Sequence, residues 1–238
     1  MSETMSHSLS TAMRVRLALG AFFQPAVMAL LLFYPPGQFE WWRAWVLIAV
    51  SFVATIVSLV VIVRTNPTIL VERFKPPWQQ GQPLVDKLVV GVFIVAFFGA
   101  IRFIPYDVFA WRLLPPPGTI VVAVGFVLWL AGWWIVTATL EANAFAVPVV
   151  KSQADRHQIV VDRGPYAIVR HPMYAGTAVM LIGMPLFLGS TAGALAALVP
   201  IALLTVRIGV EEGFLRRELA GYVGYAERVR FRLVPGVW

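Results

Sequence analysis

Apolar residues in this chain form long unbroken runs instead of stripes along one side of a helix. A continuous apolar run of about 20 residues has the length of a membrane-spanning helix. Four such runs occur in the first 140 residues, at about 17–34, 45–63, 88–104 and 119–140. The next run, from 175 to about 206, is too long for one span and has Gly189 and Ser190 near its middle. It predicts two short spans joined as a tight helical hairpin.

The pattern as a whole predicts an all-α integral membrane bundle of about six transmembrane helices, with the last two forming the hairpin. The alternative is five, if the hairpin only dips into the bilayer. The first run follows Arg14 and Arg16, as in a signal peptide. It is longer than a signal-peptide core, and Pro35, Pro36 and Gly37 follow it instead of a small-residue cleavage site. We therefore interpret it as a retained span.

Basic residues fall mainly on one side of these spans. If the N-terminus is inside, 16 of the 19 lysines and arginines lie on inside segments, all except Arg43, Arg102 and Arg112. The positive-inside rule then places both termini in the cytoplasm, which requires an even number of spans. The net charge of +7 is explained by these loops. Because no nucleic-acid motif accompanies it, we expect no nucleic-acid partner.

The remaining composition narrows the chemistry. Charged residues make up 13% of the chain, about half the share in a soluble domain. No cysteine is present, which excludes disulfides, thiolate metal ligands and cysteine nucleophiles. The three histidines, His7, His157 and His171, are too few for a histidine-rich metal site, and we expect no metal. Tryptophans near the span ends suit an aromatic belt, whereas Trp133 and Trp134 fall deeper and are expected to pack against neighbouring helices.

Polar functional groups concentrate after residue 140, so we divide the chain into a four-span region, 1–140, and a C-terminal region, 141–238. The stretch VDRGPYAIVRHPMYAG (161–176) precedes the fifth span. Proline suits the first turn of a helix, so a helix is predicted to begin at Pro172 with His171 near its N-cap. The free N–H groups of a helix start favour an anionic group.

The second polar stretch begins near the cytoplasmic end of the sixth span. Arg207 and Glu211 are four residues apart and share a helix face, while Glu212 is rotated by about 100°. A hairpin would bring the first two close to His171 and Tyr174. On residue types alone, a purely structural explanation serves at least as well: these groups would be ordinary membrane anchors, interface aromatics and solvated helix ends.

The motif GPYAIVRHPMYAG, followed near 40 residues later by EE and then GYVGYAERVRFRLVPGVW, resembles the isoprenylcysteine carboxyl methyltransferase family, which has bacterial integral-membrane members. Phospholipid methyltransferases share the RHPxYxG-then-EE pattern. The resemblance covers about residues 141–238. It implies a catalytic region made of a loop, the helical hairpin and a cytoplasmic tail, in which the loop and the last two helices bind S-adenosylmethionine. The implied cofactor residues are Lys151, Gln158, Ile159, Val160, Val161, Tyr166, His171, Pro172, Met173, Tyr174, Glu211 and Glu212.

Two positions depart from the pattern of the eukaryotic enzymes, which have glutamine where this chain has Lys151 and histidine where it has Gln158. The chemistry of the residues adds Arg170, which together with the helix start suits the carboxylate of the cofactor. In the family the arginine of the second motif is associated with substrate, so we assign Arg207 to a substrate carboxylate and name Arg207 and Glu211 as the catalytic pair. The chain shows no glycine-rich dinucleotide fingerprint.

The sequence therefore predicts a membrane methyltransferase that uses S-adenosylmethionine. It would transfer a methyl group by in-line displacement at the cytoplasmic surface, and we expect the inner membrane of a bacterium. The acceptor would be a lipophilic or prenylated substrate, either an isoprenylcysteine-like carboxylate or another O-, S- or N-nucleophile. The alternatives are a sterol-reductase-like membrane oxidoreductase and a non-enzymatic transporter or scaffold. Against a transporter, the charges lie at the ends of the spans instead of near the midplane.

Overall fold

The computed structural model describes residues 11–34 and 37–238, without the side chains of 11–14. Predictions that involve His7, the Arg14 side chain, Pro35 and Pro36 lie outside this part. Every regular element within it is helical, which confirms the all-α class. The α-helices are α1 (Thr11–Phe33), α2 (Trp42–Thr65), α3 (Pro67–Arg73), α4 (Leu84–Tyr106), α5 (Thr119–Ala142), α6 (Pro172–Leu188), α7 (Thr191–Ala196), α8 (Leu198–Glu218) and α9 (Tyr222–Arg228). A π-helical turn, Asp107–Trp111, extends α4, and two 3-10 turns, Ala154–Arg156 and Gly164–Ala167, lie between α5 and α6.

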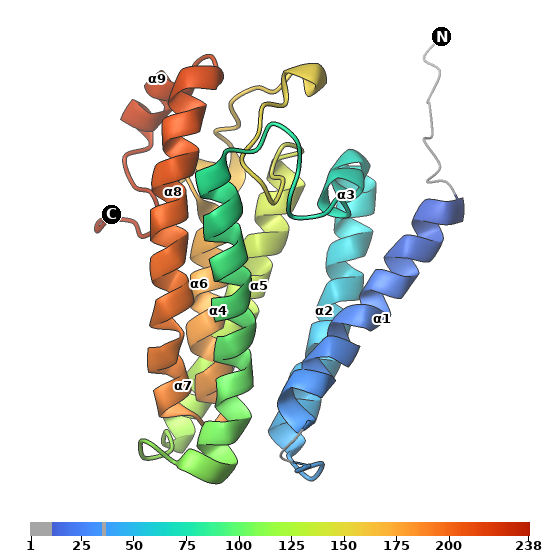
Figure 1. Cartoon of the computed structure of the whole chain (residues 1–238), viewed down its shortest axis with the longest axis vertical. Coiled ribbons are helices and arrows are strands. Elements are labelled where there is room, and N and C mark those ends of the chain that lie inside the picture. The colour runs from blue at the N-terminus through green and yellow to red at the C-terminus, as the bar shows by residue number, and fades with distance from the viewer. Residues whose placement is uncertain (1–10, 35–36) are drawn as a thin grey trace.

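Five helical segments are long and apolar enough to cross a membrane: Val15–Phe33, Trp42–Thr65, Leu84–Trp111, Thr119–Ala142 and Thr191–Glu218. The helix α6 is apolar but has 17 residues, or about 25 Å at 1.5 Å per residue, slightly less than a 30 Å hydrocarbon core. It nevertheless runs beside α5 and α8 in the bundle (Figure 1). The six-span and five-span predictions therefore differ only in how α6 is counted.

The turn of the predicted hairpin lies at Gly189 and Ser190, as expected. The helix α6 ends at Gly189, whose φ of 97° is in the left-handed region that glycine tolerates. Ser190 caps α7, and its Oγ accepts a hydrogen bond of 2.7 Å from the Gly193 amide. The return arm is α7 followed by α8, and it brings the chain back to the end from which α6 began (Figure 1).

The closest partner of α6 is α5, because glycines let the two backbones meet. A Cβ added at Gly132 would lie 2.5 Å from the Gly176 carbonyl oxygen, and one added at Gly183 would lie 2.6 Å from the Gly125 carbonyl oxygen. On each helix the two glycines are seven residues apart, so both fall on the same face. Small residues at a helix interface allow close van der Waals packing inside a membrane. The pair α5–α6 is thus a tightly packed unit at the centre of the C-terminal region.

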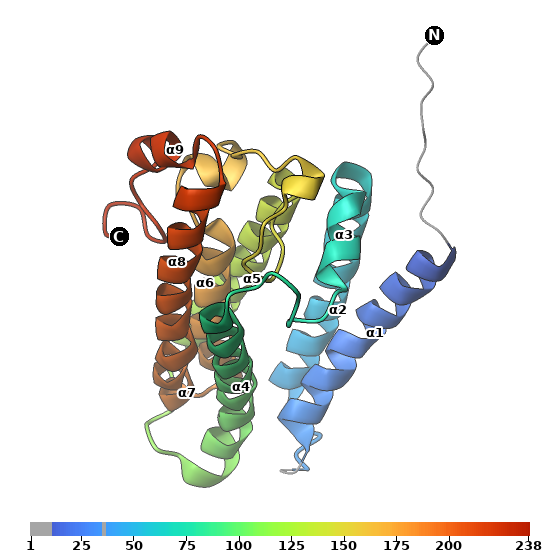
Figure 2. The same cartoon turned by 45° about the horizontal axis from the view of Figure 1, so that its top comes forward.

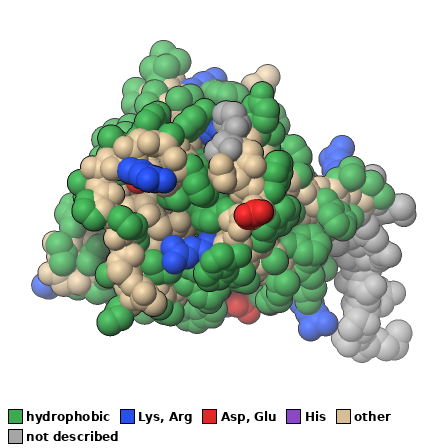
Figure 3. Space-filling view, turned by 90° about the horizontal axis from the view of Figure 1, so that it is seen from below, with side chains coloured by type: hydrophobic (Ala, Val, Ile, Leu, Met, Phe, Trp, Pro, Cys, Tyr) green, Lys and Arg blue, Asp and Glu red, His purple; other side chains and the backbone are tan. Residues whose placement is uncertain are grey.

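The two ends of the bundle differ in polarity. Figure 2 shows the long loop after α5, the helix α9 and the C-terminal segment gathered at one end, above α5, α6 and α8. The opposite end is mainly hydrophobic, with a few scattered charged side chains (Figure 3). The segments predicted to be cytoplasmic therefore share one end of the molecule, whose orientation across the membrane stays a prediction.

The two deeper tryptophans behave differently from each other. The Trp133 indole donates a hydrogen bond of 3.0 Å to Ser58 Oγ and packs against the core, as expected. Trp134 is 69% exposed, so the expectation that it packs against a neighbouring helix is wrong. Its exposed indole instead borders an apolar groove that Ala175 and Val179 of α6 also line.

Candidate functional site

A narrow cavity of about 90 Å³, which we call the loop cavity, lies at the polar end of the bundle. Its walls come from the loop after α5, the first turn of α6, the end of α8 and the helix α9. The predicted site residues that line it are Lys151, Gln158, Ile159, Val160, Val161, Tyr166, Arg170, His171, Met173, Tyr174 and Glu211. Three others, Pro172, Arg207 and Glu212, lie outside its wall.

The start of α6 has the predicted geometry. Pro172 is the first helical residue and His171 is the N-cap. The C-terminal segment runs alongside this start, because the amides of Arg170 and His171 donate to the carbonyl oxygens of Phe231 and Arg232, each over 2.9 Å. These backbone bonds place the side chains of both residues at the N-terminal end of α6.

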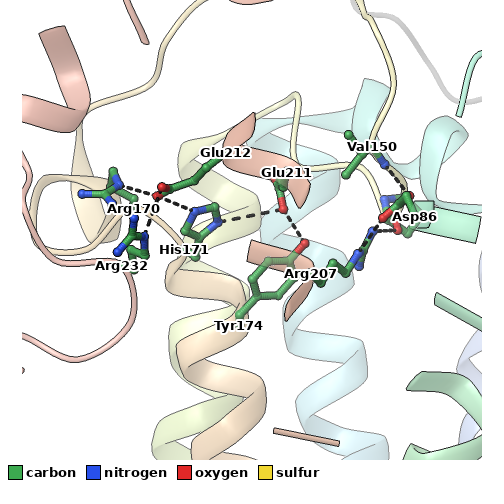
Figure 4. Close-up of polar contacts among 10 residues, drawn as sticks. Asp86, Val150, Arg170, His171, Tyr174, Arg207, Glu211, Glu212 and Arg232 are labelled. Atoms are coloured by element: carbon green, nitrogen blue, oxygen red, sulfur yellow. Dashed lines mark hydrogen bonds and ion pairs between the residues drawn. The ribbon is translucent and has the colours of Figure 1, made fainter. Parts of the chain in front are cut away.

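Glu212 is the centre of a buried cluster formed with Arg170, His171 and Arg232. Its Oε1 accepts a hydrogen bond from Arg170 Nε at 2.6 Å and lies 3.2 Å from His171 Nε2, while Oε2 accepts from Arg232 Nε at 3.1 Å (Figure 4). The Arg170 Nη1 also donates to the carbonyl oxygens of Val229 and Arg230. This ion cluster joins α6, α8 and the C-terminal segment, and it gives both carboxylate oxygens of Glu212 a partner.

Glu211, the neighbour of Glu212, faces the loop cavity instead. Its Oε2 accepts a hydrogen bond of 2.5 Å from the Tyr174 hydroxyl and lies 3.9 Å from His171 Nδ1. The rings of His171 and Tyr174 stack with centroids 5.6 Å apart. The Glu211 side chain remains 28% exposed, so its second oxygen is open to a ligand. The predicted convergence of His171, Tyr174 and Glu211 is therefore present.

Arg207 is held in place by a residue that the sequence reasoning missed. Its Nε donates to Asp86 Oδ1 at 3.2 Å, its Nη2 donates to the Pro148 carbonyl oxygen, and its guanidinium lies over the Tyr174 ring. The other Asp86 oxygen accepts from the Val150 amide at 3.0 Å (Figure 4). Asp86 thus ties α4, α8 and the loop together. An acidic residue just before a span is a signal that could have found it.

Lys151 lines the loop cavity, but its ammonium group also contacts α3 and the segment after it. The Nζ donates to Glu72 Oε2 at 3.1 Å and to Gln79 Oε1 at 2.9 Å. Burial acts to raise the pKa of Glu72, but the hydrogen bonds from Lys75 and Lys151 outweigh it and hold this pKa below its usual 4.5. Glu72 is therefore ionised at neutral pH and anchors the loop to α3.

Three tyrosines at the site have raised pKa values, chiefly because burial disfavours the phenolate. They are Tyr166, Tyr222 and Tyr225, and as neutral phenols they can donate hydrogen bonds. The Tyr225 hydroxyl donates to the Tyr166 carbonyl oxygen at 2.8 Å. The hydroxyl of Tyr222, on the wall of the loop cavity, is buried and has no partner within the described residues. A buried hydroxyl without a partner is costly unless a ligand supplies one.

A second space, which we call the membrane cavity, lies between the pair α1–α2 and the group α4, α5, α6 and α8. It measures about 550 Å³ and has mainly apolar walls, including Phe93, Phe97 and Trp133. Its few polar groups include Arg73 and Arg207. Met173 and Tyr174 line both the membrane cavity and the loop cavity, so one turn of α6 separates the two spaces.

The fold and these two cavities define a helical membrane protein with a polar site at one end of its bundle. Residues 120–220, from α5 to just beyond the end of α8, match the family model described as "Phospholipid methyltransferase", so this region is similar to that family. Over 95 residues the chain is 33% identical to "Protein-S-isoprenylcysteine O-methyltransferase B" of Arabidopsis thaliana. That alignment covers 39% of this chain and 48% of the relative, so the chain spans about half the length of the curated relative it matches. These matches confirm the resemblance predicted from the motifs.

Proposed function

We propose that this protein is an S-adenosylmethionine-dependent methyltransferase that methylates a lipophilic substrate held within the membrane. The observation that carries the proposal is the shared wall of Met173 and Tyr174. One face of this wall lines the polar loop cavity and the other lines the apolar membrane cavity. A methyl donor from water and an acceptor from the bilayer would therefore meet across one turn of α6.

The residues of the loop cavity fit the cofactor. The free oxygen of Glu211 would accept from the ammonium group or a ribose hydroxyl, and the partnerless hydroxyl of Tyr222 would bond to the same ligand. Aromatic faces of Tyr166 and Tyr174 would stabilise adenine or the sulfonium charge. When bound, the cofactor supplies an electrophilic methyl group. No contact is assigned to Glu212, whose carboxylate is already occupied by the ion cluster.

The protein would act chiefly by positioning and by excluding water. An in-line displacement needs the nucleophile aligned and desolvated close to the methyl group. The ring of Tyr174 is fixed from three sides, by the hydrogen bond to Glu211, by stacking on His171 and by the guanidinium of Arg207. A carboxylate nucleophile requires no general base at neutral pH. We infer that the fixed ring of Tyr174 keeps the nucleophile and the methyl group aligned between the two cavities.

The small loop cavity implies that the loop adjusts on binding. Its volume of about 90 Å³ is below the range of about 300–1,000 Å³ that is usual for small-molecule sites. The loop between Asn143 and Arg170 contains only two short 3-10 turns, so it is the wall that can move without breaking a long helix. Its attachments to Glu72 and Asp86 limit that movement.

Binding measurements on purified protein test the proposal. Calorimetric titration with S-adenosylmethionine should show binding, and the variant Tyr222→Phe should bind about 5- to 10-fold more weakly, from the typical worth of one hydrogen bond. Tyr34→Phe is the matched control, because Tyr34 is exposed on the first helical hairpin, away from the site. Binding of a reduced nicotinamide with none of S-adenosylmethionine would instead favour the oxidoreductase. Transfer of labelled methyl groups to host lipid extract and to prenylcysteine analogues would then identify the acceptor.

A further inference from the structure

The membrane cavity contains two arginines in an otherwise apolar setting. Arg73 reaches it from the C-terminal end of α3 and Arg207 reaches it from α8. Within the described part of the chain, no aspartate or glutamate lines this cavity. The charged groups that face the space are therefore both cationic.

The two arginines differ in whether their charge is compensated. Arg207 forms an ion pair with Asp86, which is buried. The Arg73 Nη1 donates to the Ala146 carbonyl oxygen at 3.0 Å and approaches Met173 Sδ at 3.5 Å, and both of these acceptors are uncharged. Among residues 11–34 and 37–238, with side chains from 15 onward, no carboxylate lies within ion-pair distance of Arg73.

An uncompensated guanidinium in a desolvated setting favours a bound anion. Burial lowers the pKa of Arg73, and the nearby charge of Arg207 acts in the same direction. Arginine nevertheless stays protonated, so the free energy of desolvation is relieved by an oxyanion and not by loss of a proton. A guanidinium also matches the geometry of a carboxylate or a phosphate with two parallel hydrogen bonds.

We propose that Arg73 binds the head group of the acceptor and selects an anionic lipophilic substrate over a neutral or cationic one. This rests on the proposed function. Arg73 contacts the sulfur of Met173, which is part of the wall between the two cavities. A head group bound to Arg73 would therefore lie next to the loop cavity, where the methyl donor is proposed to bind. A lipophilic amine would meet two positive charges and no carboxylate in the same place.

The position of Arg73 is fixed by contacts at both ends of α3. The Asn66 side chain donates to the carbonyl oxygens of Leu140 and Glu141 at the end of α5. Glu72, the residue before Arg73, holds Lys151 of the loop. Neighbouring residues of one short helix thus contact the loop that covers the cofactor site and the space that would hold the substrate. Such a link would let an occupied loop cavity hold Arg73 in place.

A set of ligands with one apolar tail and different head groups tests this proposal. The probes are farnesoic acid, farnesyl phosphate, farnesol and farnesylamine, with binding followed through intrinsic tryptophan fluorescence. The wild-type protein should bind the acid or the phosphate at least 10-fold more tightly than the alcohol, and the amine most weakly. The variant Arg73→Gln should bind the anions about 10- to 100-fold more weakly, a loss typical of a charge-assisted bond. Its affinity for the alcohol should not change.

The control variant is Arg64→Gln, which removes an exposed arginine at the end of α2 at the same end of the bundle. It should leave every affinity unchanged, and Arg73→Lys should retain part of the preference for anions. The acid and phosphate arms separate a carboxylate from a phosphate ligand. Unchanged anion binding by Arg73→Gln, or tight binding of the amine by wild-type protein, would overturn the assignment. Failure of S-adenosylmethionine to bind would instead overturn the proposed function, because the head-group series is measured without it.

Discussion

Exchanging the two adjacent glutamates at the end of α8 for glutamine should give opposite phenotypes. Glu212 is buried and contacts two arginines and His171, whereas Glu211 faces the loop cavity with one hydrogen bond from Tyr174. We expect Glu212→Gln to lower stability strongly. We expect Glu211→Gln to keep most of the stability and to weaken the binding of S-adenosylmethionine.

The magnitudes follow from what each change leaves behind. Glu212→Gln leaves Arg170 buried, with its Nε facing an amide in place of a carboxylate. Removing one partner of a buried ion pair costs about 3–5 kcal/mol. For a chain of this size that corresponds to a fall in Tm of roughly 6–20 °C. Glu211→Gln can keep the Tyr174 bond through its remaining carbonyl oxygen, so its expected cost is below about 1 kcal/mol.

The assay is thermal unfolding in detergent, followed by intrinsic fluorescence of the nine tryptophans. Dyes that report on exposed thiols are unsuitable, since the chain has no cysteine. Calorimetric titration with S-adenosylmethionine on each variant supplies the second measurement. A conservative control, Glu218→Gln, changes an exposed glutamate at the end of the same helix and should alter neither quantity.

A stable Glu212→Gln protein that has lost cofactor binding would refute this reasoning. It would show that Glu212 contacts the cofactor directly, as the motif alone implied. Equal loss of stability in both variants would also contradict it, because Glu211 would then belong to the same structural cluster.

Three further outcomes are expected. Gly183→Ala should destabilise the protein by about 1–3 kcal/mol, because its Cβ would lie 2.5 Å from the facing backbone nitrogen. Gly209→Ala, with nothing within 4 Å, should not destabilise it in the same thermal assay and should add up to about 1 kcal/mol from helix propensity. The pKa of Glu72 is lowered in the folded state, so its contribution to stability is complete above its ordinary value of 4.5 and is lost as pH falls through the folded value. The difference in Tm between wild type and Glu72→Gln should therefore shrink below about pH 4.5, and a constant difference would exclude the lysine contacts as its cause. Asp86→Asn should raise the KM for substrate more than it changes cofactor affinity, and equal effects on both would argue for a purely structural role.

Local signals in the sequence were sufficient for the long apolar helices and for half of the site, but not for the short helices α3 and α9. The runs of apolar residues gave the spans, and the proline after His171 fixed where α6 begins. The turn at Gly189 then placed Glu211 near Tyr174, because both lie close to the ends of the two arms. Each of these inferences depends on residues that are near in sequence or joined by one short turn.

The rest of the site depends on contacts between distant segments. Asp86 and Arg207 are 121 residues apart, and no period or motif connects them. The missing partner of the Tyr222 hydroxyl becomes visible only once its surroundings are packed. Likewise, the family pattern named Glu212 as a cofactor residue, but its three partners come from two separate stretches of the chain, Arg170 and His171 before α6 and Arg232 near the C-terminus. Side-chain type indicated that these groups matter, and tertiary packing decided what each one touches.

The boundary of the family match has an evolutionary consequence. The matched residues, 120–220, begin one residue after the start of α5, so they include the glycine-packed pair α5–α6 and the arm α8. Arg73, Phe93 and Phe97, which line the membrane cavity, come from outside that stretch. The loop cavity lies within the matched stretch except for Tyr222 and Tyr225, whereas the membrane cavity is lined from both parts of the chain. Under the proposed function, changes in the unmatched helices could therefore alter the acceptor while leaving most of the proposed donor site as it is.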